Sequence, residues 1–134
     1  AILGICLGSQ LIATACGAEV RRHTEWEVGW HPIEITGFGT LQCFQYHQDT
    51  FDLPEGAELI ATNSITKNQG FRLGQKILAV QFHPETTLEK LKVYAADDDQ
   101  PVGIYVQTPA QMMAGEDWLE PQKQWFFSEL ERLT

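Results

Sequence analysis

The sequence predicts an α/β domain with a partly parallel sheet and flanking helices. Residues 1–6 are an apolar run, and the spacing of apolar residues becomes helical directly after it. A second apolar run at 76–83 is stopped by Pro84, after which the spacing is again helical. Strands that alternate with helices favour parallel pairing. The 134 residues suit a single domain, with the motifs in 1–87 and the C-terminal helices in 88–134.

Each element can be placed in turn along the chain. The run 1–6 predicts a buried strand, and the helix after it is expected to end near Gly17. Strand-like segments lie on either side of the "EVGW" stretch. Another includes a turn at its start and ends at Tyr46, and a further one precedes a turn-rich segment. These are 18–23, 31–36, 37–46 and 57–64, with the turns at 65–75. The string "NQGF" within that segment indicates a turn.

The C-terminal part is expected to be helical. Thr86 or Thr87 is a suitable N-cap for a helix up to residue 96, and the acidic stretch 97–101 breaks it. Thr108 followed by Pro109 marks the start of another helix. The last helix, 121–133, carries an apolar stripe that we expect to pack on the sheet rather than on a partner.

Composition excludes several function classes. The net charge is −9, from 18 acidic and 9 basic residues, and no basic cluster exceeds the Arg21-Arg22 pair. We therefore expect no nucleic-acid partner and no membrane association. The first ten residues lack the basic start of a signal peptide. Three cysteines without CxxC spacing disfavour disulfides and metal binding, so we expect a cytoplasmic protein in which Cys16 and Cys43 are buried.

Cys6 differs from the other two cysteines. It lies at the strand-to-helix junction in "GICLG", which has the form of a nucleophile elbow, with small residues at −2 and +2 where strand and helix approach. A thiol there is exposed at the helix N-terminus, and the N–H of Leu7 points to where an oxyanion would form. The pattern alone is equally compatible with a buried cysteine in a glycine-flanked turn.

A cysteine nucleophile needs a histidine base and a group that orients it. His83 ends a buried strand, and Glu85 two residues later would share its face of the strand. His47 is a second candidate, whereas His23 and His31 are interpreted as surface or loop residues. "FHPE" alone could be a capping histidine and a solvated glutamate. Together with Cys6, however, it predicts a site at one carboxyl edge of the sheet.

"GICLGSQLIA" and "AVQFHPE" together resemble the class I, triad-type glutamine amidotransferases, and "EVGWHPI" and "FQYHQDTFDLPEGAELIATN" resemble intervening segments of that family. The likeness covers about residues 1–87 and is nearest to stand-alone proteins similar to the glutaminase domain of GMP synthase. It implies a flavodoxin-like fold, and a triad of Cys6 as nucleophile, His83 as base and acid, and Glu85 as the group that orients it.

The resemblance also implies how the substrate is held. Leu7 would supply one oxyanion donor through its N–H, and Gln10 matches a position that contacts glutamine. Main-chain groups around His47, Gln48 and Asp49 match the segment that grips the α-amino and α-carboxylate ends of the substrate.

The sequence departs from the family pattern before the nucleophile. Family members carry preceding strands and a glycine-rich loop with the second oxyanion donor, and nothing before Cys6 plays that part here. A sheet that began at residue 1 would leave a long exposed edge. We therefore expect the chain to be the C-terminal part of a larger domain, or to assemble with its missing part.

Three functions stay open at this point. The first is a glutaminase that releases ammonia, whose partner would be a synthetase or other acceptor protein. The second is a hydrolase of γ-glutamyl peptides or amides on the same triad, and the third is a non-catalytic remnant or interaction module. Glutamine or a γ-glutamyl compound is the expected ligand, no cofactor or metal is expected, and a homo-oligomer stays open.

Overall fold

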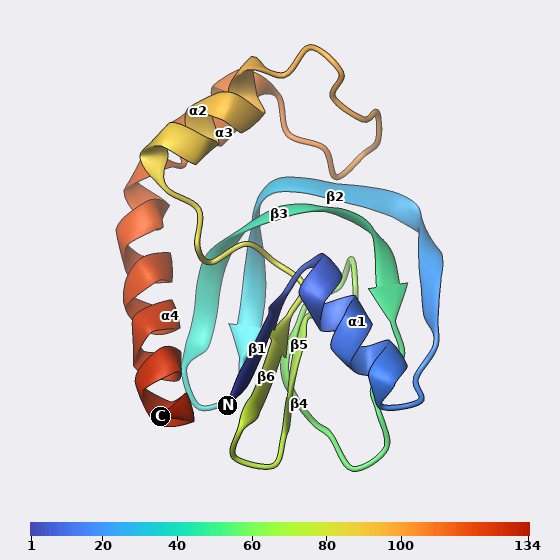
Figure 1. Cartoon of the computed structure of the whole chain (residues 1–134). Coiled ribbons are helices and arrows are strands. Elements are labelled where there is room, and N and C mark those ends of the chain that lie inside the picture. The colour runs from blue at the N-terminus through green and yellow to red at the C-terminus, as the bar shows by residue number, and fades with distance from the viewer.

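The computed structural model describes residues 1–134 as a six-stranded sheet with helices packed on it (Figure 1). The strands lie in the order β1-β6-β5-β4-β2-β3. Their bounds are β1 (Ile2–Ile5), β2 (Val20–Ile35), β3 (Gly39–Phe51), β4 (Glu58–Thr62), β5 (Gly70–Leu73) and β6 (Ile77–Val80). The helices are α1 (Leu7–Ala15), α2 (Leu88–Ala96), α3 (Pro109–Ala114) and α4 (Leu119–Leu133), with a short 3-10 helix at Glu116–Trp118. None of the helices is long and apolar enough to cross a membrane.

The α/β fold class is confirmed, although only one pair of neighbouring strands is parallel. β1 and β6, the two strands expected to meet at one edge, pair in parallel. All other strand pairs are antiparallel. One parallel pair therefore suffices to bring the carboxyl ends of β1 and β6 together.

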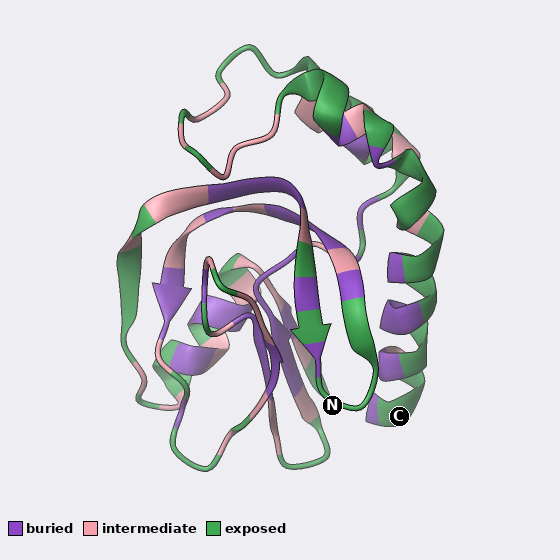
Figure 2. Ribbon diagram, turned by 180° about the vertical axis from the view of Figure 1, so that it is seen from behind, coloured by how far each residue is buried: buried purple, intermediate pink, exposed green.

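Alternate residues of β6 enter different cores. Leu78 and Val80 pack in one cluster with Trp125 of α4, whereas Ala79 packs in another with Ala13 of α1. Because successive side chains of a strand point to opposite faces, α1 and α4 cover opposite faces of the sheet. The apolar stripe of α4 is buried toward the sheet and its outer side is exposed, which confirms the packing expected from its sequence (Figure 2).

β2 and β3 form a long antiparallel ribbon that curls beyond the rest of the sheet (Figure 1). Only two residues of β2 pair with β4. Three expectations are wrong here: β2 is one continuous strand, β3 runs past Tyr46 to Phe51, and the turn-rich segment contains β5. Pairing with the neighbouring strands overrides the weak local patterns.

α2 and α3 begin where the sequence predicts, whereas α4 begins at Leu119, two residues before its expected start. Thr87 caps α2 by accepting from the Lys90 N–H, and Thr108 forms a capping box with Gln111 at the start of α3. A third core joins α2 and α3 to the ribbon, with Trp30 and Phe44 of the strands packed against Leu91 of α2 and Met112 of α3. This core fixes the ribbon above the ends of β1 and β6.

Candidate active site

Cys6 occupies a sharp bend between β1 and α1. Its backbone angles are φ 51° and ψ −107°, and no other non-glycine residue has a positive φ. Its N–H donates to the Val80 carbonyl oxygen at 2.8 Å, which ties the bend to the end of β6. A Cβ on Gly4 would lie 2.6 Å from the backbone of Gly8, so the bend requires glycine at position 4. A Cβ on Gly8 would meet nothing, so only one of the two expected small positions is enforced by contacts here.

His83 reaches the same place from the other strand of the parallel pair. β6 ends at Val80, and the His83 N–H donates to the Phe44 carbonyl oxygen of β3 at 2.8 Å. His83 Nδ1 lies 2.7 Å from Glu85 Oε1. Glu85 lies in the turn after Pro84, so this contact arises from a turn and not from the strand alternation that the sequence suggested.

The Cys6 side chain lies near enough to the His83 imidazole to affect its pKa. Burial lowers the pKa of His83, but the hydrogen bonds and negative charges of Cys6 and Glu85 outweigh it and raise the pKa from 6.5 to about 9. His83 is therefore protonated at neutral pH. His83 thus pairs with Glu85 on one side and lies near the Cys6 thiol.

A pocket of about 270 Å³ opens beside the thiol. It is lined by Cys6, Leu7, Gln10, Arg22, Trp26, Tyr46, His47, Gln48 and Asp49. The structure therefore brings all five residues predicted to bind substrate to one cavity next to Cys6. The Leu7 N–H, the first in α1, has no intrahelical acceptor and is free for a ligand oxygen.

The side chains of the predicted binding residues are mostly engaged within the protein. Gln10 Nε2 donates to the Asp49 carbonyl oxygen at 3.3 Å and to Gln81 Oε1 at 3.2 Å. Gln48 Nε2 donates to the His23 carbonyl oxygen at 3.1 Å. Asp49 pairs with Arg22 at the rim of the pocket.

His47 is buried and is held by a carboxylate that the sequence interpretation did not assign. Its Nε2 lies 2.9 Å from Glu27 Oε1, and both side chains are almost inaccessible to solvent. Glu27 also accepts hydrogen bonds from Asn63, Thr66 and Gln69. The signal available in the sequence was a lone glutamate in the otherwise apolar "EVGW".

This buried network fixes the charge of Glu27. Burial raises the pKa of Glu27, but the hydrogen bond and charge of His47 and the hydrogen bonds of Asn63 and Gln69 lower it below its usual value. His47 Nδ1 contacts the Asp49 carbonyl oxygen at 3.1 Å. The pair thus anchors the wall of the pocket on β3.

The remaining histidines and cysteines lie elsewhere. His23 and His31 are half-buried within β2, and the expectation of a loop position is wrong because β2 is continuous. Cys43 is fully buried as expected, whereas Cys16 is only half-buried. Burial, with the charge of Glu27, raises the pKa of the Cys43 thiol well above its usual value, which leaves it unreactive.

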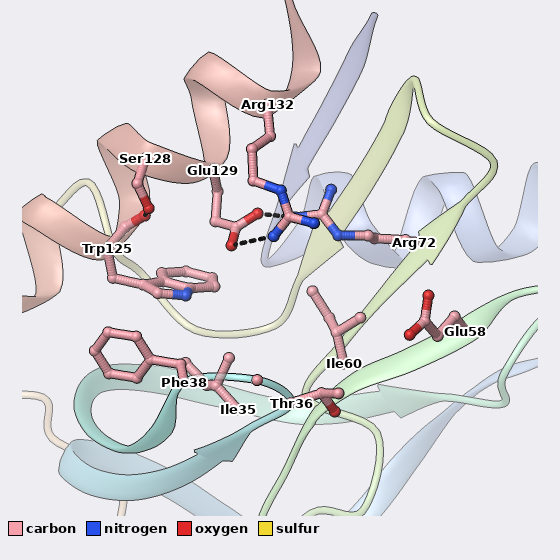
Figure 3. Close-up of a pocket in the computed structure, with 11 residues that line it drawn as sticks. Ile35, Thr36, Phe38, Glu58, Ile60, Arg72, Trp125, Ser128, Glu129 and Arg132 are labelled. Atoms are coloured by element: carbon pink, nitrogen blue, oxygen red, sulfur yellow. Dashed lines mark hydrogen bonds and ion pairs between the residues drawn. The ribbon is translucent and has the colours of Figure 1, made fainter.

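A second cavity, of about 370 Å³, lies between α4 and the β2–β3 turn and contains neither a thiol nor an imidazole (Figure 3). Glu129 of α4 forms ion pairs there with Arg72 of β5 and with Arg132 of its own helix. These contacts fasten α4 to the sheet, so we assign this cluster a structural role.

Comparison with known proteins agrees with this geometry. The family model for glutamine amidotransferase class-I matches residues 1–99. The glutamine amidotransferase-like protein YfeJ of Salmonella typhimurium is 29% identical over 149 aligned residues, covering 99% of this chain and 62% of YfeJ. One subunit of the glutamine-hydrolysing GMP synthase of Sulfolobus acidocaldarius is 34% identical over 93 residues, covering 62% of this chain and 50% of that protein.

A solved structure of a glutamine amidotransferase is also similar to this chain. The glutamine amidotransferase of Thermotoga maritima has a TM-score of 0.81 and 32% identity, covering 98% of this chain and 61% of its own. This chain thus spans less than two thirds of these relatives. Because the family model matches most of the chain, the chain belongs to the class-I glutamine amidotransferase family.

Proposed function

We propose that this protein hydrolyses the side-chain amide of glutamine and releases ammonia, using Cys6 as nucleophile, His83 as acid and base, and Glu85 as the group that orients His83. The 2.7 Å contact of His83 with Glu85, on an imidazole whose pKa Cys6 also raises, is the observation that supports this function best. A thiol at a strained bend beside a ligand-sized pocket is consistent with it.

The steps follow from the states of these groups. The Cys6 thiolate attacks the amide carbon, and the developing oxyanion accepts a hydrogen bond from the free N–H of Leu7. The C–N bond breaks as His83 gives its proton to the leaving ammonia, which leaves a γ-glutamyl thioester. His83 then takes a proton from water, whose oxygen attacks the thioester. The C–S bond breaks, and glutamate leaves.

Substrate orientation is assigned to the ribbon side of the pocket. Residues 47–49 line the cavity, where Glu27 holds the His47 side chain and Gln10 donates to the Asp49 carbonyl oxygen. We propose that these groups bind the α-amino and α-carboxylate ends of glutamine, with the side-chain amide toward Cys6.

We further propose that the ammonia passes to a separate acceptor protein. One relative is named as a single subunit of a glutamine-hydrolysing GMP synthase, which supports a division of labour between subunits.

The test combines labelling with turnover. An electrophilic glutamine analogue is expected to label Cys6 stoichiometrically, and Cys6→Ser should abolish both labelling and ammonia release. Cys16→Ser, which changes the half-buried cysteine just after α1, should leave both intact. Folded protein that neither labels at Cys6 nor releases ammonia would contradict the proposal. Faster consumption of a γ-glutamyl amine than of glutamine would reassign the site to a γ-glutamyl hydrolase.

A further inference from the structure

We propose that Gln81 is a catalytic residue that donates an amide hydrogen bond to the Cys6 thiolate, and that Gln10 is a positioning residue that holds Gln81 in the donating orientation. This inference rests on the proposed function, because it concerns the same nucleophile. Gln81 is fully buried and follows β6 directly, two positions before His83. Its Nε2 lies 3.6 Å from Cys6 Sγ.

The contacts of Gln10 determine which end of the Gln81 amide faces the sulfur. Gln10 Nε2 lies 3.2 Å from Gln81 Oε1, and an amide nitrogen can only donate. The oxygen of Gln81 must therefore face Gln10, and its nitrogen must face Cys6. If Gln81 were flipped, two NH₂ groups would meet in a buried site, which is unfavourable.

Gln10 and Gln81 are themselves held in place. Gln10 donates its second hydrogen to the Asp49 carbonyl oxygen at 3.3 Å. The backbone N–H of Gln81 donates to the Gln69 carbonyl oxygen at 2.8 Å. Neither amide can turn without breaking a buried hydrogen bond, so the donor is preorganised.

The sulfur has different partners for its two protonation states. As a thiol it can donate to the Tyr46 carbonyl oxygen, at 3.8 Å. As a thiolate it can only accept, and Gln81 and the protonated His83 then supply donors. When the thiol loses its proton, the donors Gln81 and His83 replace the Tyr46 acceptor, so the thiolate has hydrogen-bond donors.

This arrangement affects both halves of the reaction. The hydrogen bond enlarges the fraction of Cys6 that is ready to attack the amide. In the second half, water adds to the thioester carbon, the C–S bond breaks, and the electron pair returns to sulfur. Gln81 then stabilises the departing thiolate, and a stabilised thiolate leaves faster.

The test compares two replacements of Gln81 that keep its length. Gln81→Met removes the donor, and Gln81→Glu places a carboxylate beside the sulfur. At neutral pH, the ultraviolet absorbance of the Cys6 thiolate, measured against Cys6→Ser, should fall in the first and fall further in the second. Alkylation of Cys6 by iodoacetamide should slow about 10-fold or more in Gln81→Met, the effect of losing one hydrogen bond to a charged group.

Two further variants control for structural effects. Gln45→Met removes another fully buried amide, whose Nε2 donates to Gln69, and should leave the thiolate signal and the alkylation rate unchanged. Gln10→Met leaves Gln81 in place but frees its amide, so it should lower the thiolate signal by a smaller amount. It provides the same measurement if Gln81→Met does not fold.

The outcomes separate this inference from the proposed function. An undiminished thiolate signal and alkylation rate in folded Gln81→Met, or in Gln10→Met if Gln81→Met does not fold, would overturn the role of Gln81, even if Cys6 remains the nucleophile. A wild-type protein whose Cys6 neither labels with a glutamine analogue nor yields ammonia would instead contradict the proposed function.

Discussion

His83 and Glu85 share a hydrogen bond of 2.7 Å although only Pro84 separates them in the chain. The contact forms in a turn after β6, where the fixed backbone of proline sends the chain back toward the imidazole. With Nδ1 occupied by Glu85, Nε2 is the nitrogen left to face Cys6. Orientation of the base is therefore encoded locally, whereas its meeting with the thiol depends on the fold.

The pH dependence of turnover should reveal this contact. Because the pKa of His83 is raised to about 9, it should carry the proton needed by leaving ammonia up to that pH, and ammonia release should decline above it. In Glu85→Gln, one cause of the raised pKa is removed, so the decline should begin at a lower pH. The measurement is the pH profile of kcat, and an unchanged alkaline limb in folded Glu85→Gln would contradict the role of Glu85.

Replacing Glu27 by glutamine should destabilise the fold. The NH₂ group of the introduced side chain would meet donors from His47 and Gln69 in a site closed to solvent. We expect Glu27→Gln to lower the free energy of unfolding by about 2–4 kcal/mol in urea titrations. Glu55→Gln, on an exposed carboxylate, should change it by less than about 0.5 kcal/mol.

The same carboxylate should make stability sensitive to acid. The pKa of Glu27 is lower in the folded than in the unfolded chain, so its stabilisation is present above about pH 4.5 and is lost as pH falls through the folded value. Urea titrations of the wild type and of Glu27→Gln between neutral pH and this acid range should therefore converge. Parallel curves across this range would show that Glu27 is not charged in the fold.

The two glycines around Cys6 should respond oppositely to the same substitution. Gly4→Ala places a Cβ 2.6 Å from the Gly8 backbone and should destabilise the protein by about 2–3 kcal/mol. Gly8→Ala lies in α1 with open space around its Cβ and should stabilise it by up to about 1 kcal/mol. Thermal unfolding of both variants checks this, and equal effects would mean that β1 and α1 are not in close contact.

Glu129 should contribute strongly to the attachment of α4. Its side chain is 9% exposed, and Glu129→Gln would leave Arg72, which is 13% exposed, without its ionic partner (Figure 3). A loss of about 2–3 kcal/mol in the free energy of unfolding is expected. Arg132→Gln removes a partner that is 67% exposed and should cost below about 1 kcal/mol. If both variants lower the free energy of unfolding equally, the Glu129–Arg72 pair contributes no more than the more exposed Glu129–Arg132 pair.

Much of the site could be predicted because its signals are local. "GICLG" placed Cys6 at a strand-to-helix junction, and "FHPE" placed His83 after a buried strand, and both positions are as expected. Thr87 and Thr108 likewise indicated the starts of α2 and α3, because an N-cap depends only on neighbouring residues.

The parts that the sequence did not reveal depend on long-range pairing. The length of β2 is set by its ladder with β3, not by the alternation of its own residues. Glu27 and Gln81 looked like isolated polar residues, because their partners lie 20 or more positions away in the chain. The hints available were a polar residue beside apolar neighbours, in "EVGW" for Glu27 and in "AVQF" for Gln81.

The bend at Cys6 has a consequence for thermal stability. A residue with a side chain at φ 51° and ψ −107° is held in a conformation that glycine adopts at lower cost. Cys6→Gly should accordingly raise the melting temperature while abolishing turnover. The protein would then be more stable without the proposed nucleophile than with it, so selection for stability alone would remove Cys6.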